Sequence, residues 1–279
     1  MNQKPLVNIS NKPFFFPAKE IWRYKDLLFF MVWRDITVLY KQTILGFLWA
    51  ILNPLFQIVI FSVVFGYLAG IKPDVMGIPY FLFSAFAVIP WTYFSNSLST
   101  SANSLLSSSA LINKVYFPRI ILALTPVLSK LMDFFISLFI VLVLLVVYQI
   151  NPGIRLLLLP IPVVLVIITA LGMGTLLSTL VIQFRDVRFA LNFLMPLLMY
   201  IAPVAFPASL VVEKLGTTWF RLYALYPMVG VIESFRACFI PTKAFPWELV
   251  GISYVGAIIL FFFGIAYFKK MENFFADIA

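Results

Sequence analysis

The chain has 279 residues, 63% hydrophobic and only 11% charged, whereas soluble domains carry about 25% charge, so we predict an all-α, polytopic membrane protein rather than a soluble one. The formal net charge of +9 is then expected to mark cytoplasmic loops, not a nucleic-acid-binding surface. With no histidine and one cysteine, Cys238, the chain is expected to have no metal site and no internal disulfide.

The chain begins with a polar, proline-bearing stretch, residues 1–18, which we expect to be a cytoplasmic tail. Residues 19–43 mix basic and aromatic side chains, which favours an amphipathic interface helix on the membrane surface; a solvated linker helix is the alternative. The side chains expected to meet lipid head groups are Trp22, Arg23, Lys25, Arg34 and Lys41.

Six long apolar stretches follow, and we predict one transmembrane span in each. Residues 44–68 are uncharged and cover about 37 Å as a helix, against about 30 Å of hydrocarbon. The other spans are predicted at residues 80–98, 120–149, 156–184, 189–206 and 249–268. Lys130 and Asp133 lie three residues apart in the third span and are expected to pair. Lys and Arg are concentrated before the first span and in alternate loops, so both termini are expected in the cytoplasm.

Residues 207–247 require a choice between a further span and an external segment. A span from Thr218 to Ile240 would bury Arg221, Glu233 and Arg236, each at about 3 kcal/mol. We therefore predict two short re-entrant helices that meet at Tyr226-Pro227. The aromatic residues expected to close an external mouth, or to form an inert packing plug, are Trp219, Tyr223, Tyr226, Phe235 and Phe239.

The sequence contains no motif that would supply energy for transport. It has no GxxxxGK[ST] phosphate loop, so any ATP must be bound by another chain. It also has no recognisable nucleophile–base set, so we do not expect an enzyme. A separate motor would push on the loop at residues 99–119 and on the turn at residues 185–188, unless the former is an ordinary flexible loop. The candidate contacts are Ser104, Leu105, Asn113, Lys114, Arg119, Arg185, Asp186 and Arg188.

Several strings together resemble the permease subunits of ABC transporters that export polysaccharides, a family that includes O-antigen, teichoic acid and capsule exporters. The most specific is WRDITVLYKQTILGFLWAILNPL, which starts at Trp33. PYFLFSAFAVIPWTYFSNSL, LINKVYFPR, FRDVR and YPMVGVIESFR follow in the expected order. The resemblance covers most of the chain and implies six spans with cytoplasmic termini, an interface helix and two re-entrant helices.

The resemblance also implies partners, a location and a cargo. It implies a homodimer in a bacterial cytoplasmic membrane, with two ATPase subunits that hold ATP and Mg²⁺, and a lipid-linked polysaccharide as substrate. The segment near Ser104 to Lys114 would then be the coupling helix. The basic residues of the interface helix would hold the lipid diphosphate, or simply attract anionic phospholipid.

Aromatic rings pack against the apolar faces of sugars without demanding a charge, so aromatic and amide side chains are candidates to line a conduit. These candidates are Trp49, Asn53 and Phe56 on the first span and Asn192, Phe193 and Tyr200 on the fifth. Two other functions stay open at this point: a related ABC exporter of drugs, lipids or peptides, and a channel or secondary carrier that needs no nucleotide.

Overall fold

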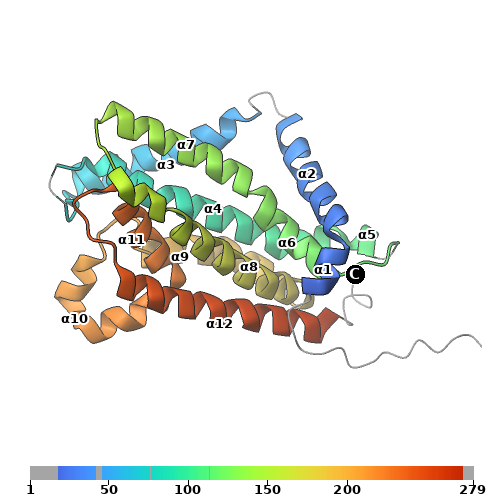
Figure 1. Ribbon diagram of the computed structural model, residues 1–279. Helices are drawn as coiled ribbons and strands as arrows, with labels where there is room; N and C mark the ends of the chain where they lie inside the picture. The colour runs from blue at the N-terminus through green and yellow to red at the C-terminus, as the bar shows by residue number, and fades with distance from the viewer. Residues whose placement is uncertain (1–17, 42–45, 76, 113, 273–279) are drawn as a thin grey trace, which may run out of the picture.

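The computed structural model describes residues 18–41, 46–75, 77–112 and 114–272. Helices are the only regular secondary structure in these ranges, with no β-strand among them, which confirms the all-α class. The long helices form one bundle (Figure 1). Helix α1 (Ala18–Arg23), α5 (Ser109–Ile112) and the C-terminal end of α12 (Trp247–Met271) lie at one end of the bundle, and α10 (Ser209–Ala224) lies at the other.

Within the described residues, four helical segments are long and apolar enough to cross a bilayer, namely Leu48–Leu68, Ile120–Val147, Gly153–Gln183 and Trp247–Met271. They correspond to the first, third, fourth and sixth predicted spans. The first consists of α3 (Leu48–Phe61) and the π-helical segment η1 (Ser62–Leu68). The fourth consists of η2 (Gly153–Leu158) and α8 (Pro160–Gln183), which follow a short turn at Asn151. Large apolar side chains on these segments are exposed, as expected of a multi-pass membrane protein whose surface faces lipid.

The predicted third span is divided in two. Helix α6 (Ile120–Ser129) and α7 (Leu131–Val147) meet at Lys130, whose backbone stays helical: its N–H donates to Pro126 O at 3.0 Å and its carbonyl oxygen accepts from Phe134 N–H at 3.1 Å. Pro126, one turn earlier, has no N–H to donate, so α6 lacks one hydrogen bond to the turn before it.

Helix α4 (Tyr80–Ser107) runs through the centre of the bundle and packs against α3, α6, α7, α8 and α11 (Pro227–Phe239). The prediction that this helix ends at Leu98 is wrong, because residues 99–107 continue it. Serine hydroxyls bond back to carbonyls, as Ser104 Oγ does to Ser101 O at 2.7 Å, so the serine-rich stretch satisfies its polar groups as a helix.

Two other helix boundaries in the structure differ from the predicted ones. The interface helix at residues 19–43 divides at Tyr24 into α1 and α2 (Lys25–Lys41); residues 42 and 43 lie outside the described ranges. Helix α9 (Arg185–Ile201) already begins at Arg185, so the predicted turn at 185–188 is its first helical turn. It ends at Ile201 because Ala202 precedes Pro203 and takes an extended conformation, which proline favours in the residue before it.

Between α9 and α12 the chain forms two helices, α10 and α11, with a break directly before Pro227. Tyr226 is extended and Pro227 occupies the first turn of α11, as the sequence predicts. All thirteen residues of α11 are buried. It packs against α4, α8 and α12, so a helix that carries Glu233, Ser234 and Arg236 lies in the protein interior.

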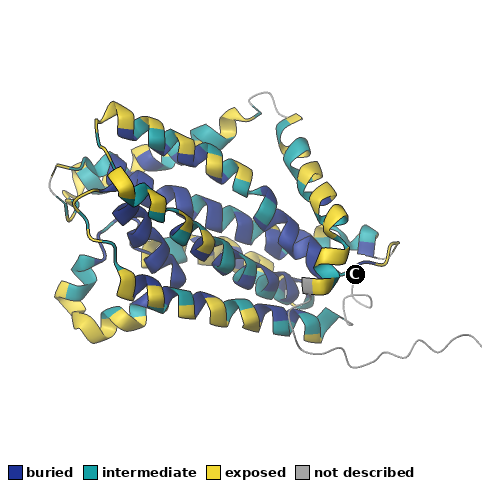
Figure 2. Ribbon diagram, viewed as in Figure 1, coloured by how far each residue is buried: buried dark blue, intermediate teal, exposed yellow. Residues whose placement is uncertain are grey.

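The core is centred on α4, α8 and α11. Figure 2 shows α4 and α11 as buried over most of their length, whereas α2, α9, α10 and the outer faces of α3 and α7 are largely exposed. Helices α8 and α12 approach closely at Gly172 and Gly264: a Cβ added at Gly264 would lie 2.2 Å from the carbonyl oxygen of Gly172. Both positions therefore require glycine for this contact.

Candidate functional site

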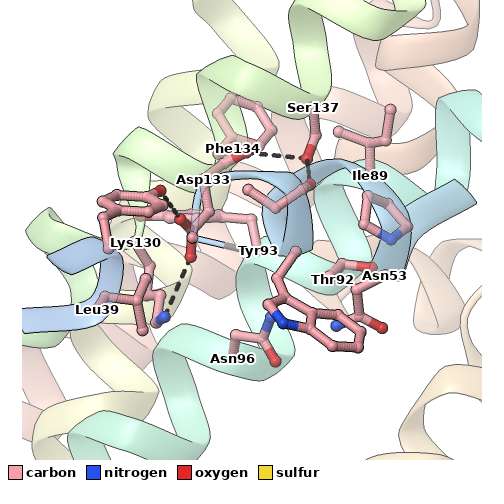
Figure 3. Close-up of a pocket in the computed structure, with 15 residues that line it drawn as sticks. Leu39, Asn53, Ile89, Thr92, Tyr93, Asn96, Lys130, Asp133, Phe134 and Ser137 are labelled. Atoms are coloured by element: carbon pink, nitrogen blue, oxygen red, sulfur yellow. Dashed lines mark hydrogen bonds and ion pairs between the residues drawn. The ribbon is translucent and has the colours of Figure 1, made fainter. Parts of the chain in front are cut away.

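A cavity of about 250 Å³ opens between α2, α3, α4 and the junction of α6 with α7. Figure 3 shows Asn53, Thr92 and Asn96 along one side of the cavity and the Lys130–Asp133 pair along another. The residues that line it come from four separate parts of the sequence. Its polar and aromatic lining consists of Tyr40, Trp49, Asn53, Thr92, Tyr93, Asn96, Lys130, Asp133, Phe134 and Ser137.

The charged part of the cavity is an ion pair, as the spacing of Lys130 and Asp133 predicts. Lys130 Nζ lies 3.1 Å from Asp133 Oδ2, and the Tyr40 hydroxyl donates to Asp133 Oδ1. Burial, together with the hydrogen bond to Asp133 and its negative charge, raises the pKa of the Tyr40 phenol, so it remains protonated and able to donate. Tyr40 therefore ties the end of α2 to α7.

The opposite part of the cavity presents polar groups without protein partners. No side-chain hydrogen bond joins Asn53 or Asn96 to another residue in the described ranges, whereas Thr92 Oγ1 donates to Gln57 Oε1 at 3.2 Å. Trp49 borders this part and is 52% exposed. Two amides and one indole face are thus available to a ligand.

The structure places the predicted conduit residues in two sets. Trp49 and Asn53 line the cavity, while Phe56 lies outside it and is 59% exposed on α3. The second set lies on α9, which packs against α8 and α4 and leaves most of its side chains exposed. Its members, Asn192, Phe193 and Tyr200, are all exposed and do not line the cavity. Within one chain, the two sets do not enclose a common space.

The predicted coupling residues divide by burial. Ser104 and Leu105 are buried in α4, so the expectation that they contact a partner directly is wrong for this chain as folded. Lys114 is exposed beside a second cavity of about 300 Å³, which is also lined by Ile112, Val115, Tyr116, Phe117 and Arg119. Asn113 lies outside the described residues. The remaining charged candidates, Arg185, Asp186 and Arg188, are exposed at the start of α9.

Arg119 has a structural role that its position in a loop did not suggest. Its backbone N–H donates to Glu272 Oε1 at 3.3 Å, and its Nη1 donates to the Glu272 carbonyl oxygen at 2.6 Å. Burial raises the pKa of the Glu272 carboxyl, against the opposing effect of Arg119. The loop after α5 is therefore fixed to the end of α12.

The predicted head-group residues are all on the surface. Trp22 is 73% exposed, and the Lys25 ammonium lies 5.2 Å from the centre of its ring. Arg34 pairs with Asp35 at 2.8 Å, which leaves Arg23 and Lys41 as further exposed cations on α1 and α2. The helices also expose Phe29, Phe30 and Trp33, while Met31 packs into the bundle.

The predicted external gate is brought together only in part. Tyr223 donates to Ile201 O at 2.7 Å and Tyr226 to Leu198 O at 3.4 Å, so both tie α10 and its end to α9. Trp219 is exposed. Phe235 and Phe239 are fully buried, because the aromatic residues on α11 pack into the core. Phe239 stacks on Phe86 with ring centres 5.0 Å apart.

Sequence reasoning missed a buried charge cluster that involves α11. Arg236 Nη1 lies 2.7 Å from Glu233 Oε1, and Lys243 Nζ lies 2.7 Å from both Glu233 Oε2 and Asp74 Oδ2. Arg236 also donates from Nη2 to a carbonyl at 3.1 Å and lies over the Phe83 ring. The three-residue spacing of Glu233 and Arg236 was a signal for this pair.

The charge balance of this cluster keeps Glu233 ionised. Burial opposes ionisation, but Arg236 and Lys243 outweigh it and lower the pKa of the Glu233 carboxyl below its usual 4.5. Helix α11 is not among the segments long enough to cross a membrane. The free-energy cost of burying Glu233 and Arg236 was the argument against a seventh span. In the structure, the pairing of the two charges offsets this cost.

Two comparisons with known proteins agree with this architecture. The chain is 27% identical over 258 residues to an O-antigen export system permease protein, RfbA, from Myxococcus xanthus, a match that covers 92% of this chain and 97% of that protein. It is 29% identical over 255 residues to an RfbA from Klebsiella pneumoniae, covering 91% of this chain and 95% of that protein. The family model of the ABC-2 type transporter matches residues 26–240, from the start of α2 to the end of α11. The chain therefore belongs to the ABC-2 type transporter family and is a membrane permease of that family.

Proposed function

We propose that this protein is the membrane subunit of an ATP-driven exporter that moves lipid-linked polysaccharide across a bacterial cytoplasmic membrane. The observation that carries the proposal is the similarity to O-antigen export permeases over more than nine-tenths of the chain. The absence of a phosphate loop from the sequence supports a separate ATPase, which would hold the ATP and Mg²⁺.

The proposed topology has six spans and two cytoplasmic termini. Besides the four candidate spans, α4 and α9 would cross; the seventeen residues of α9 cover about 26 Å, close to the hydrocarbon thickness. The thirteen residues of α11 cover only about 20 Å, and non-crossing backbone at membrane depth is tolerated where protein surrounds it. The complete burial of α11 supports a re-entrant arrangement for α10 and α11.

The exposed faces of α3 and α9 support a homodimer. Both helices flank α4 and present aromatic side chains to the outside, including Phe56, Phe193 and Tyr200. Two copies that meet along these faces would place the two conduit sets, separate in one chain, around a shared path. Trp219, Tyr223 and Tyr226 would border its external end.

Two ATPase subunits would dock at the opposite end of the bundle. The exposed residues available there are Lys114, Val115 and Tyr116, together with the charged first turn of α9. The Arg119–Glu272 contact would transmit movement from this loop to α12. Charge reversal by Lys114→Glu should reduce co-purification of the ATPase and polymer export while the melting temperature of the permease stays unchanged.

Helices α1 and α2 would lie at the cytoplasmic membrane surface. Their exposed aromatic residues suit the interface, and Arg23, Lys25 and Lys41 would meet either the diphosphate of the lipid-linked polymer or anionic phospholipid. Binding of a polyprenyl diphosphate to the purified protein in neutral lipid separates these two roles.

Deletion of the gene tests the function as a whole. In the native host, loss of the permease should remove the polymer from the cell surface and leave lipid-linked polymer inside the cytoplasmic membrane, with restoration by the wild-type gene. Unchanged surface polymer, together with altered export of a drug, peptide or simple lipid, would assign the chain to another class of exporter.

A further inference from the structure

The cavity between α2, α3, α4 and the α6–α7 junction has the features of a ligand site that a single chain completes. Asn53 and Asn96 face it with side-chain amides that make no hydrogen bond within the described residues. Each amide offers two donors and one acceptor oxygen. Trp49 adds an aromatic surface at the same rim.

The charge of the lining selects against an anion. Lys130 is the one cation among the residues that line the cavity, and Asp133 neutralises it at 3.1 Å. Both carboxylate oxygens of Asp133 are engaged, one by Lys130 and the other by the Tyr40 hydroxyl. Phosphate and diphosphate require an excess of positive charge, which this lining does not provide. A neutral, polar ligand fits the balance.

The arrangement of the neutral groups indicates a carbohydrate. Amide side chains can donate to one hydroxyl and accept from its neighbour, and an indole face packs against the apolar C–H face of a sugar ring. The cavity volume of about 250 Å³ lies just below the roughly 300–1,000 Å³ typical of small-ligand pockets, which suits one monosaccharide rather than a longer segment.

We propose that this cavity binds a single uncharged sugar unit of the exported polymer, with Asn53 and Asn96 as hydrogen-bonding residues and Trp49 as the stacking surface. The inference rests on the proposed function. It adds a sugar-binding subsite within each protomer, separate from the conduit proposed between the two protomers. Thr92 and the Lys130–Asp133 pair border the subsite and set its neutral, polar character.

Thiol labelling of the full-length permease in lipid nanodiscs tests the subsite. Cys238 is fully buried, so Thr92→Cys introduces one thiol at the cavity and leaves Asn53, Asn96 and Trp49 in place. Val59→Cys provides the control, because Val59 lies on α3, is 47% exposed and belongs neither to the cavity lining nor to the proposed conduit set. The probes are glucose, galactose, mannose, N-acetylglucosamine and the repeat unit released from the host's own polymer, with inorganic phosphate for comparison.

At a concentration about ten times its dissociation constant, a bound sugar should slow labelling of the Thr92→Cys protein about tenfold, with no change in the Val59→Cys protein. Adding Asn53→Ala or Asn96→Ala should remove most of this protection. Protection by phosphate alone, equal protection of both thiols, or no protection by any sugar would overturn the proposal. If the Thr92→Cys protein does not fold, Ala50→Cys, which also lies at the cavity, replaces it with the same expectations.

The labelling requires neither nucleotide nor transport, so its outcome is separable from that of the exporter proposal. ATP-driven polymer export without protection at Thr92 would overturn the sugar subsite alone. Protection in a protein that moves no polymer would overturn the proposed function and leave a carbohydrate site.

Discussion

Two ion pairs with the same spacing lie in different surroundings. Glu233 and Arg236 lie within the core on α11, where the charged groups have side chains with 5% and 0% exposure. Lys130 and Asp133 lie at the α6–α7 junction beside an open cavity, with 19% and 22% exposure. The buried pair is enclosed by carbonyl groups, Lys243 and an aromatic ring, whereas the cavity pair borders amides that make no hydrogen bond within the described residues. The same three-residue spacing therefore forms a structural contact in one place and borders the proposed sugar site in the other.

Breaking the buried pair should have the largest effect on stability. Glu233→Leu leaves Arg236 without its carboxylate in the core, which should lower the free energy of unfolding by about 3–5 kcal/mol. The double change Glu233→Leu with Arg236→Met should recover much of this loss, because both charges are then removed. Denaturant unfolding in detergent measures both. A stable single variant would show that water reaches Arg236.

Acid should act through the same pair. Because the pKa of Glu233 is lowered in the folded protein, its stabilising contribution is complete above its usual pKa of 4.5 and is lost as the pH falls below that value. The wild type should lose up to about 1.4 kcal/mol per pH unit more than Glu233→Gln in this range. Unfolding curves between neutral pH and the acid limit of the detergent make the comparison. Parallel curves would contradict the ionised pair.

The cavity pair should matter less for stability than the buried pair. Asp133→Asn removes the charge that Lys130 contacts but leaves the cavity partly open to solvent, so the expected loss is about 1–2 kcal/mol. Protection of the Thr92→Cys thiol by sugar should fall at the same time, since Lys130 is left uncompensated. A loss of stability as large as that at Glu233 would identify the cavity pair as structural.

Tyr40→Phe should have the smallest effect. It removes one hydrogen bond between α2 and Asp133, which corresponds to about 0.5–1.5 kcal/mol. The measurement with the sharper readout is labelling of the Thr92→Cys thiol without ligand, which should become faster when the end of α2 is released. Tyr24→Phe is the matched control, because Tyr24 lies at the other end of α2, between α1 and α2, and does not line the cavity. Equal rates in both variants would show that Tyr40 does not restrict the cavity.

Much of the architecture follows from the sequence because it depends on length and local chemistry. Long uncharged stretches predict spans. Proline disfavours a helical conformation in the residue before it, which predicts the break before Pro227. The continuation of α4 to Ser107 was missed, since serines that bond back to their own helix resemble loop residues in composition.

The residues of the candidate site are harder to predict from the sequence, because the packing of the helices determines which of them meet. Phe235 and Phe239 were assigned to an external mouth, since composition does not distinguish an aromatic residue that faces a conduit from one that packs in the core. Trp49 and Asn53 were identified as aromatic and amide side chains within the first predicted span. Tyr40, Thr92 and Asn96 were not, because only the fold brings α2 and α4 to the same cavity.

The most direct test of the account is transport in proteoliposomes that contain this permease and its partner ATPase, with lipid-linked polymer supplied on the ATPase side. The account predicts that polymer appears on the opposite side only when both subunits, ATP and Mg²⁺ are present. Translocation by the permease alone, or at an equal rate without nucleotide, would contradict it.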